Sequence, residues 1–317
     1  MFFVEIQEFG PVRRIVAWNS AGVRLEVLPD NGAALNAFYV PTRDGRFLNV
    51  IDGCNTESEL DESASAYKGV FLFPFPNRLQ DGIWNWEGKT CSFPLNEPAR
   101  QNALHGILHN QKFEVVETMA TSEMALIHLT FSSDSSDSAF PFQYQVDIEF
   151  IVTDNEGLVI KTQVTNLGTS IIPIGFGWHP YFSSGSQLDD LIFSFPDVSA
   201  LEVDKRMIPT GARMPFHVFD RPQSFGKVVL DTGFELNPCD VYRIYILDPS
   251  QKLKFSIWQE AGTDGYRFVQ IYTHPGRKSI AIEPMTCMAN ALQTQKDGIL
   301  FLESGNSHQV DWGISFR

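Results

Sequence analysis

The sequence predicts an all-β fold, a large and mostly antiparallel β-sandwich, and three observations lead to this prediction. Apolar and polar residues alternate with a period of two in several segments, which is typical of strands that bury one face. No convincing amphipathic helix of ten or more residues occurs. The 23 glycines and 18 prolines recur along the chain and interrupt any long helix. We therefore expect two stacked sheets, each with one face in a shared core.

The clearest strand signal is the segment 143–152, QYQVDIEFIV, in which every second residue from Tyr144 to Phe150 is apolar. The segment 158–166 alternates in the same way, and the turn residues DNEG between the two predict a hairpin. A second hairpin is predicted from two segments that flank EAGTDG, 252–259 and 266–273. Further strands are expected at 22–28, 124–131, 242–247 and 279–284.

The length and the charge of the chain limit its organisation and its partners. All-β domains can be large, and no Pro/Ser-rich linker or repeat divides the 317 residues, so we expect one domain over 1–317. Hydrophobic residues make up 43% of the chain and include 26 phenylalanines, which is enough for a sizeable aromatic core. The net charge of −14 repels nucleic acid and anionic membranes, so neither is expected as a partner.

The cysteines and the N-terminal segment indicate a compartment. Cys54, Cys91, Cys239 and Cys287 are scattered without a C-x-x-C pair, as buried free thiols in a reducing compartment would be. The segment MFFVEIQEFGPVRR contains glutamates where a signal peptide has a long apolar run. No stretch approaches the ~18 apolar residues of a membrane span. We therefore expect a cytoplasmic protein.

Sequence motifs for cofactors and metals do not occur. The seven histidines form no H-x-x-x-H or H-x-E arrangement of the kind that binds zinc. G-x-S-x-G, Walker and G-x-G-x-x-G motifs are also missing. The sequence therefore predicts neither a metal nor a cofactor.

Four short stretches contain the polar residues that general acid–base chemistry needs. They are FPFPNRLQDGIW with Asn77 and Arg78, NALHG with His105, GFGWHPYF with His179, and SIAIEPM with Glu283, which is expected at the end of an apolar strand.

Each stretch also has a structural interpretation. His105 could hold a turn, Asn77 could help to pin a loop, and Glu283 could form a buried ion pair with Arg78. His274, in THPG, is interpreted as a turn residue. Taken together, the four stretches favour an acid–base site for a polar neutral substrate, and the surrounding aromatic residues suit a sugar ring.

These stretches resemble motifs of the aldose 1-epimerase, or galactose mutarotase, family. Residues 77–106 are similar to the family's N-R … N-x-L-H-G segment, 174–182 to its H-P-Y-F segment and 280–292 to its E-P … N-A segment. The resemblance implies the family's β-supersandwich fold, which agrees with the predicted strands. It also implies a free aldose as the small-molecule substrate and an isomerase activity without a cofactor. We expect a monomer or a homodimer.

The resemblance further implies roles for four residues and places Asn77 beside them as a sugar-binding residue. Glu283 matches the catalytic base that takes the proton from the anomeric hydroxyl, and His179 matches the acid that protonates the ring oxygen. His105 matches the second active-site histidine. Arg78, which follows Asn77, matches the arginine that holds sugar hydroxyls.

Three more residues are expected at the site. Asp231, in VLDTGF, is a looser match to a sugar-binding aspartate, and Trp178 and Tyr181 are expected to shape the pocket wall. The chain departs from the family pattern in Gly-Trp before H-P-Y-F, in Met-Thr after E-P and in HGILHNQ, with the additional His109. The sugar therefore need not be galactose.

Three alternatives remain open from the sequence. A hexose-6-phosphate mutarotase of the same fold would need additional cations, for which Arg206, Arg213 and Arg243 are available. A non-catalytic sugar-binding protein would not need an acid and a base together. A glycosidase would use two carboxylates, whereas the recognisable set has one carboxylate and two histidines.

Overall fold

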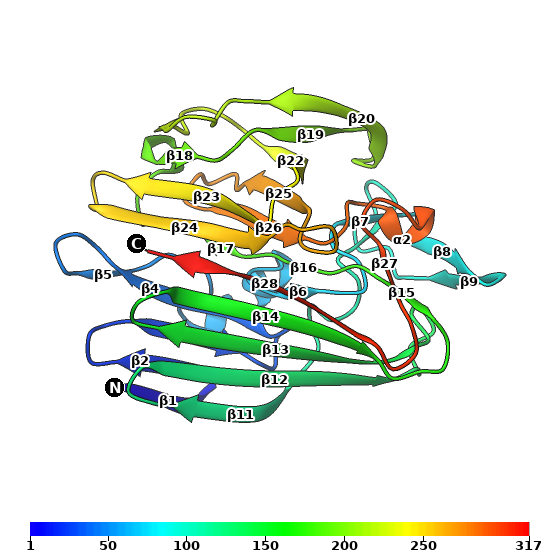
Figure 1. Ribbon diagram of the computed structural model, residues 1–317, viewed down its shortest axis with the longest axis horizontal. Coiled ribbons are helices and arrows are strands. Elements are labelled where there is room, and N and C mark those ends of the chain that lie inside the picture. The colour runs from blue at the N-terminus through cyan, green and yellow to red at the C-terminus, as the bar shows by residue number, and fades with distance from the viewer. Residues whose placement is uncertain (317) are drawn as a thin grey trace.

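A computed structural model describes residues 1–316 and consists almost entirely of antiparallel sheets, as predicted (Figure 1). Residue 317, the last of the expected single domain, lies outside the described part. The largest sheet has nine strands, in the order β11 (Glu114–Ala120), β12 (Met124–Asp134), β13 (Gln143–Thr153), β14 (Gly157–Asn166), β28 (Ser307–Ser315), β24 (Leu253–Glu260), β23 (Val241–Asp248), β18 (Ile192–Ser194) and β21 (Gln223–Ser224).

Two further large sheets complete the main body of the fold. One has the five strands β1 (Phe2–Phe9), β2 (Val12–Asn19), β3 (Arg24–Leu28), β4 (Ala34–Pro41) and β5 (Phe47–Asn49). The other has eight strands, in the order β20 (Pro209–Phe216), β19 (Val198–Val203), β22 (Asp231–Leu236), β25 (Phe268–Thr273), β26 (Ile280–Met285), β16 (Gly177–Trp178) and β6 (Phe71–Leu72), with β17 (Tyr181–Phe182) also paired to β26.

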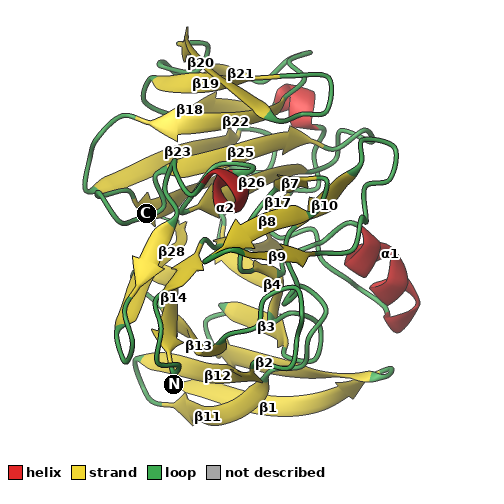
Figure 2. Ribbon diagram, turned by 90° about the vertical axis from the view of Figure 1, so that its right-hand side faces the viewer, coloured by secondary structure: helices red, strands yellow, loops and turns green. Residues whose placement is uncertain are grey.

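The remaining elements are short. Three two-stranded sheets pair β7 (Arg78–Gln80) with β10 (Asn102–Leu104), β8 (Ile83–Trp86) with β9 (Lys89–Ser92), and β15 (Ile172–Ile174) with β27 (Leu300–Leu302). The helical elements are the α-helices α1 (Leu60–Ser65) and α2 (Ala291–Thr294) and the 3₁₀ turns η1 (Glu57–Glu59) and η2 (Leu188–Asp190), which lie outside the sheets (Figure 2). Among residues 1–316 no helix is long and apolar enough to cross a membrane.

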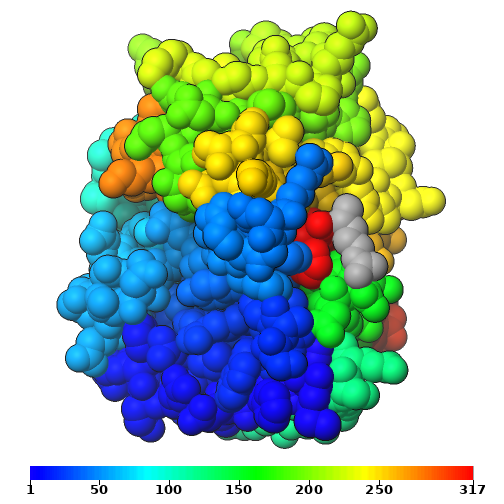
Figure 3. Space-filling model, turned by 90° about the vertical axis from the view of Figure 1, so that its left-hand side faces the viewer, coloured from blue at the N-terminus to red at the C-terminus, as the bar shows by residue number. Residues whose placement is uncertain are grey.

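The three large sheets occupy different parts of the molecule. The nine-stranded sheet runs over most of the height of the molecule. The five-stranded sheet lies near its lower strands, and the eight-stranded sheet lies near its upper strands and extends above them with β19 and β20 (Figure 1). In the space-filling view the N-terminal sheet, in dark blue, forms the lower part of one face and yellow residues form the upper part, with the red C-terminal segment between them (Figure 3). The main apolar core connects residues from Phe2 to Ile314, and smaller separate clusters form around Leu72 and around Phe268.

The first predicted hairpin is confirmed. β13 and β14 pair in register from Tyr144 opposite Asn166 to Thr153 opposite Gly157. Gly157 has φ +96°, and a Cβ there would lie 2.1 Å from the carbonyl oxygen of Ile314, so only glycine fits at this turn.

The second predicted hairpin is wrong. β24 pairs with β23 and β28 in the nine-stranded sheet, whereas β25 pairs with β22 and β26 in the eight-stranded sheet. The buried Gln259 donates its amide hydrogens to the carbonyls of Tyr266 and Phe268, at 2.6 and 3.1 Å. These side-chain bonds stabilise a chain that crosses from one sheet to the other instead of turning back on β24.

The cysteine prediction is correct in part. All four cysteines are free thiols, and Cys54 and Cys287 are buried. Cys91, in strand β9, and Cys239, in the loop before β23, are only half-buried, because each packs against the rim of the apolar core and not inside it.

Candidate active site

A pocket of about 490 Å³ lies over one face of the eight-stranded sheet, and the strand register explains which side chains enter it. Gln270 of β25 lies opposite Glu283 of β26 and opposite Gly233 of β22, and the next row on the same face contains Asp231, Tyr272 and Tyr181. The lining residues are Ser65, Ala66, Tyr67, Asn77, Arg78, Arg100, Leu104, His105, His179, Tyr181, Asp231, Gln270, Tyr272, His274, Pro275 and Glu283.

Glu283 lies inside a strand, not at its end as expected. β26 continues through Pro284, which lies opposite Val269, to Met285. On the other edge of β26 the amides of Ile282 and Thr286 donate to the carbonyls of Pro180 and Phe176. Pro284, halfway between them, has no N–H to donate, so the ladder is interrupted opposite Trp178, the residue before His179.

The backbone of His179 is held by a different strand. Its N–H donates to the carbonyl of Val70, 3.1 Å away, and its carbonyl accepts from the N–H of Gly69, 2.9 Å away. This pairing with the chain just before β6 fixes His179 between β16 and β17, beside the face of β26 that carries Glu283.

His179 and Glu283 form the closest acid–base contact of the pocket. The Nε2 atom of His179 lies 3.3 Å from Oε1 of Glu283, and both residues are buried. Burial lowers the pKa of His179 to about 4. Burial, reinforced by the charge of Asp231, raises the pKa of Glu283 well above its usual value. The uncharged pair and the charged pair contain the same number of protons, and burial favours the uncharged one.

His105 is fixed in one tautomer by its backbone neighbour. The N–H of Asn77 donates to Nδ1 of His105 at 3.1 Å, so in the neutral imidazole the hydrogen is on Nε2. The N–H of His105 donates back to the carbonyl of Asn77 at 2.9 Å. Burial lowers the pKa of His105 well below its ordinary value, and the neighbouring His179 acts in the same direction, with ring centroids 5.1 Å apart.

Arg78 pairs with Glu97, so the alternative of an ion pair between Arg78 and Glu283 is wrong. Nε and Nη2 of Arg78 donate to the two carboxylate oxygens of Glu97 at 3.0 and 3.1 Å. Glu97 also accepts from Arg100 Nη1 and from Asn102 Nδ2, each at 2.8 Å. Burial alone would raise the pKa of Glu97. The hydrogen bonds from Arg78 and Asn102 outweigh this effect, so that the pKa is lowered. Glu97 therefore leaves Glu283 without an arginine partner and holds Arg78 in place.

Asn77 and Asp231 both line the pocket, as the resemblance implied. Asn77 has a left-handed backbone, with φ +60°, and its Oδ1 accepts from the N–H of Arg78 at 2.9 Å. Asp231 Oδ1 accepts from Nε2 of Gln270 at 2.8 Å. Gln270 thus orients a second carboxylate on the same face of the sheet as Glu283.

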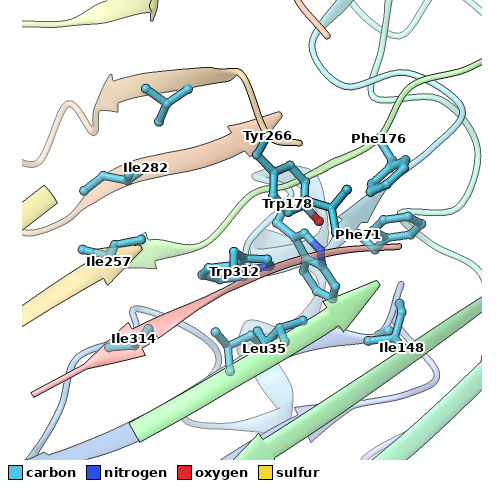
Figure 4. Close-up of a cluster of buried hydrophobic side chains, with 14 of the residues drawn as sticks. Leu35, Phe71, Ile148, Phe176, Trp178, Ile257, Tyr266, Ile282, Trp312 and Ile314 are labelled. Atoms are coloured by element: carbon cyan, nitrogen blue, oxygen red, sulfur yellow. The ribbon is translucent and has the colours of Figure 1, made fainter. Parts of the chain in front are cut away.

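The expectation for Trp178 is wrong, whereas Tyr181 does line the pocket. The side chain of Trp178 is fully buried in the core with Phe71 and Trp312, and its indole N–H donates to the hydroxyl of Thr162 at 3.1 Å (Figure 4). Adjacent residues of an extended strand point to opposite faces, so a neighbour of His179 turns into the core. The ring of Tyr181 is stacked on that of His179, with centroids 5.2 Å apart.

Sequence reasoning missed nine lining residues, five of which have aromatic, charged or amide side chains: Tyr67, Arg100, Gln270, Tyr272 and His274. Two of them, Gln270 and Tyr272, could have been found from the sequence, because the strands 266–273 and 279–284 were both predicted. Pairing these two strands with each other would have placed Gln270 opposite Glu283. His274 does accept a turn hydrogen bond from the N–H of Gly276 at 3.2 Å, but its ring also borders the pocket.

Within the described part of the chain, no three His, Cys, Asp or Glu side chains gather as metal ligands would. The histidine and carboxylate groups that line the pocket can transfer protons, and its arginine and amide groups can donate hydrogen bonds to a ligand.

A family model described as aldose 1-epimerase matches residues 14–315. The uncharacterized protein YihR of Escherichia coli K12 is 28% identical over 263 residues, which are 80% of this chain and 80% of that protein. The aldose 1-epimerase of the same strain is 24% identical over 184 residues, 57% of this chain and 50% of its own. A galactose mutarotase-like protein of Clostridium acetobutylicum, at 19% identity, superposes over 100% of this chain and 98% of its own with a TM-score of 0.86. The likeness confirms the predicted galactose mutarotase-like β-supersandwich, and the chain belongs to the aldose 1-epimerase family.

Proposed function

We propose that the protein is an aldose 1-epimerase that interconverts the α and β anomers of a free aldose. The observation that carries this proposal is the 3.3 Å contact between His179 Nε2 and Glu283 Oε1 in a polar pocket. The anomeric hydroxyl and the ring oxygen of an aldose are bonded to the same carbon. A base for the first and an acid for the second must therefore be neighbours, as these two groups are.

The reaction would start from the charged pair, the Glu283 carboxylate and the His179 imidazolium. Glu283 takes the proton of the anomeric hydroxyl, His179 gives its proton to the ring oxygen, and the bond between the anomeric carbon and the ring oxygen breaks to give the open-chain aldehyde. Because burial disfavours both charges, this transfer moves the pair towards its uncharged form.

Rotation about the bond next to the aldehyde then presents its other face. Protonated Glu283 returns its proton to the aldehyde oxygen, while the hydroxyl formed on ring opening attacks the carbon and gives its proton to His179. The pair ends in the charged form in which it began, so the cycle needs no cofactor and no net exchange of protons with water.

The other polar groups of the pocket would bind the sugar. Arg78, held by Glu97, and the Nε2–H of His105 are donors for sugar hydroxyls. Asp231, oriented by Gln270, is an acceptor. These fixed donors and acceptors around a pocket of about 490 Å³ suit a monosaccharide with several hydroxyls.

Polarimetry tests the proposal directly. Freshly dissolved α-glucose and α-galactose are followed with the wild type, with Glu283→Gln and with Glu149→Gln, a control carboxylate on β13 outside the pocket. We expect the wild type and the control to speed relaxation to the same end point and Glu283→Gln to lose this effect. Equal acceleration by Glu283→Gln would refute the role of Glu283. Binding of either sugar without acceleration would identify a sugar-binding protein, and release of a phenol from nitrophenyl glycosides would identify a glycosidase.

One observation favours a second candidate, an aldose that carries an anionic group such as a 6-phosphate. The cations considered from the sequence do not support it, because Arg206 bonds to Asp81 and Arg213 lies near Glu235, and neither these two nor Arg243 line the pocket. Arg100, however, does line it.

Arg78 and Arg100 share the single carboxylate of Glu97, so this corner of the pocket has one positive charge in excess. We propose to compare glucose with glucose 6-phosphate by exchange NMR, which measures anomer interconversion at equilibrium. A preference for the phosphate that Arg100→Gln removes would establish the anionic substrate. The same preference in Arg100→Gln, or none in the wild type, would reject it.

A further inference from the structure

Tyr67 occupies a backbone position that normally belongs to glycine. It follows helix α1 with φ +56°, in the left-handed region. The N–H of Tyr67 donates to the carbonyl of Ala64 at 3.1 Å and the N–H of Lys68 donates to that of Ser63 at 3.0 Å, which is the Schellman arrangement that ends many helices. Residues with a Cβ are strained at this position, and such strain persists mostly where the side chain has a function.

The side chain of Tyr67 contacts three histidines. Its ring centroid lies 4.6 Å from that of His105, 5.0 Å from that of His109 and 6.1 Å from that of His179. Its hydroxyl accepts from Nδ2 of Asn96 at 3.0 Å. A residue from the end of α1 thus lies against both histidines of the proposed acid–base site.

The side chain of Asn96 links Tyr67 to the backbone next to His105. Its Nδ2 also donates to the carbonyl of Leu104 at 3.1 Å, and its Oδ1 accepts from the N–H of Leu104 at 2.6 Å. Leu104 directly precedes His105, which has a left-handed backbone with φ +63°. The Asn96 side chain therefore ties the hydroxyl of Tyr67 to the backbone that sets the position of the His105 ring.

Several charged or titratable groups surround the two imidazoles. Glu283 approaches His179 from β26, and Arg78 acts on His105 from β7. Asp231 of β22 faces Glu283 across the pocket, and His109 follows His105 in the chain. Lys68 is paired with Asp52 at 3.1 Å, next to the ring of Tyr181. Tyr67 is the group that contacts both imidazoles without being charged itself at neutral pH.

We propose that Tyr67 is a positioning residue, which packs His105 and His179 against each other and keeps water from their rings, so that the two imidazoles together accept no more than one proton. The inference rests on the proposed epimerase function. Two imidazoliums with ring centroids 5.1 Å apart would repel each other, and a dry ring environment disfavours both. A single proton in this cluster is what a cycle with one base and one acid needs.

Two substitutions separate the ring of Tyr67 from its backbone. Tyr67→Phe keeps the ring and loses the bond from Asn96. Tyr67→Asn removes the ring, yet asparagine tolerates the left-handed backbone, so a loss cannot be assigned to the helix end. The matched control is Tyr272→Asn, which removes a tyrosine from the same pocket. Tyr272 makes an edge-to-face contact with Tyr181 and no ring contact with His105 or His179.

The readouts are kcat, KM and the pH profile of anomer exchange, with circular dichroism as the folding check. For Tyr67→Asn we expect kcat to fall roughly 10–100-fold, because small misplacements of catalytic groups cost about this much, with less than about a threefold change in KM. Water then reaches the imidazoles, the charged forms become less costly, and the acidic limb of kcat moves to higher pH. Tyr67→Phe should leave the acidic limb of the kcat–pH profile at its wild-type position. Tyr272→Asn should change KM and also leave this limb in place.

The inference would be overturned if the acidic limb of kcat stays in place in folded Tyr67→Asn, or if only KM rises. Tyr67 would then merely form part of the pocket wall. If the wild type itself accelerates no sugar, the proposed function fails, and the inference is then judged by NMR titration of the histidine ring protons. A rise in the pKa of His105 and His179 in Tyr67→Asn would support it, and unchanged titration curves would reject it.

Discussion

Gln270 lies directly opposite Glu283 in the β25–β26 ladder, and its side-chain amide donates to Asp231 on the neighbouring strand β22, 2.8 Å away. Three adjacent strands of one sheet thus place two carboxylates and one amide on the same face. The position opposite Gln270 on β22 is Gly233, where a Cβ would lie 3.1 Å from Oε1 of Gln270. Its small size leaves room for the amide to turn towards Asp231.

Replacing Gln270 with methionine should weaken sugar binding more than catalysis. Methionine has a similar length but cannot donate to Asp231, so the carboxylate loses its orienting partner, while His179 and Glu283 keep their contact. Loss of one oriented hydrogen bond to a charged group corresponds to about 1.5–3 kcal/mol, or roughly 10–100-fold in kcat/KM. Steady-state kinetics should show most of this in KM. A loss confined to kcat would place Gln270 in the proton transfers instead.

Glu283→Gln should remove activity and alter the pH dependence of stability. The base is lost, so kcat should fall on the order of 10²–10⁴-fold. Because the pKa of Glu283 is raised in the folded protein, wild-type stability falls as the pH rises from about 4.5, the ordinary value, through the folded pKa. Glutamine removes this ionisation. Urea unfolding should therefore show the variant gaining on the wild type as the pH increases above 4.5.

Equal pH slopes for the wild type and Glu283→Gln would contradict the raised pKa. Glu149→Gln, on the polar face of the nine-stranded sheet, is the control for a general effect of removing one negative charge from this acidic chain.

The strands and the chemistry of the site were predictable from the sequence to different degrees. Period-two alternation identifies β13 and β14 because each has one dry and one wet face. β25 is buried on nearly all positions, so its pattern cannot show which strand it pairs with, and the predicted hairpin with β24 was wrong. Trp178 was placed in the wrong environment for a related reason, since a short irregular strand does not reveal which face is core. Tyr67 gives no sequence signal, because its role depends on a left-handed backbone.

The ion pair between Arg78 and Glu97 should contribute a coupling free energy to the stability of the protein. Their side chains are each only 12% exposed, so Arg78→Met leaves a poorly solvated carboxylate with fewer donors. We expect this variant to lose about 1–3 kcal/mol of unfolding free energy. Glu97→Gln should lose a similar amount, and the double variant less than the sum. Additive losses in urea unfolding would show that the pair contributes no coupling.

The buried histidines should lower the free energy of unfolding at acidic pH. The pKa of His179 is about 4 in the folded protein, against an ordinary value of 6.5, and that of His105 is also well below 6.5. Below pH 6.5 the unfolded chain binds protons that the folded chain rejects, so the free energy of unfolding falls as the pH drops towards 4. His179→Asn and His105→Asn should each flatten this fall. Thermal unfolding between pH 4 and 7 measures it, and unchanged slopes in both variants would contradict the low pKa values.

Trp178→Phe tests the assignment of Trp178 to the core. The smaller ring leaves space beside Phe71 and Trp312 and removes the donor to the hydroxyl of Thr162. Such a change should cost roughly 1–3 kcal/mol of unfolding free energy. Because the indole does not line the pocket, KM for the sugar should stay within about threefold of the wild type. A large rise in KM with little loss of stability would return Trp178 to the pocket wall, where the sequence alone had placed it.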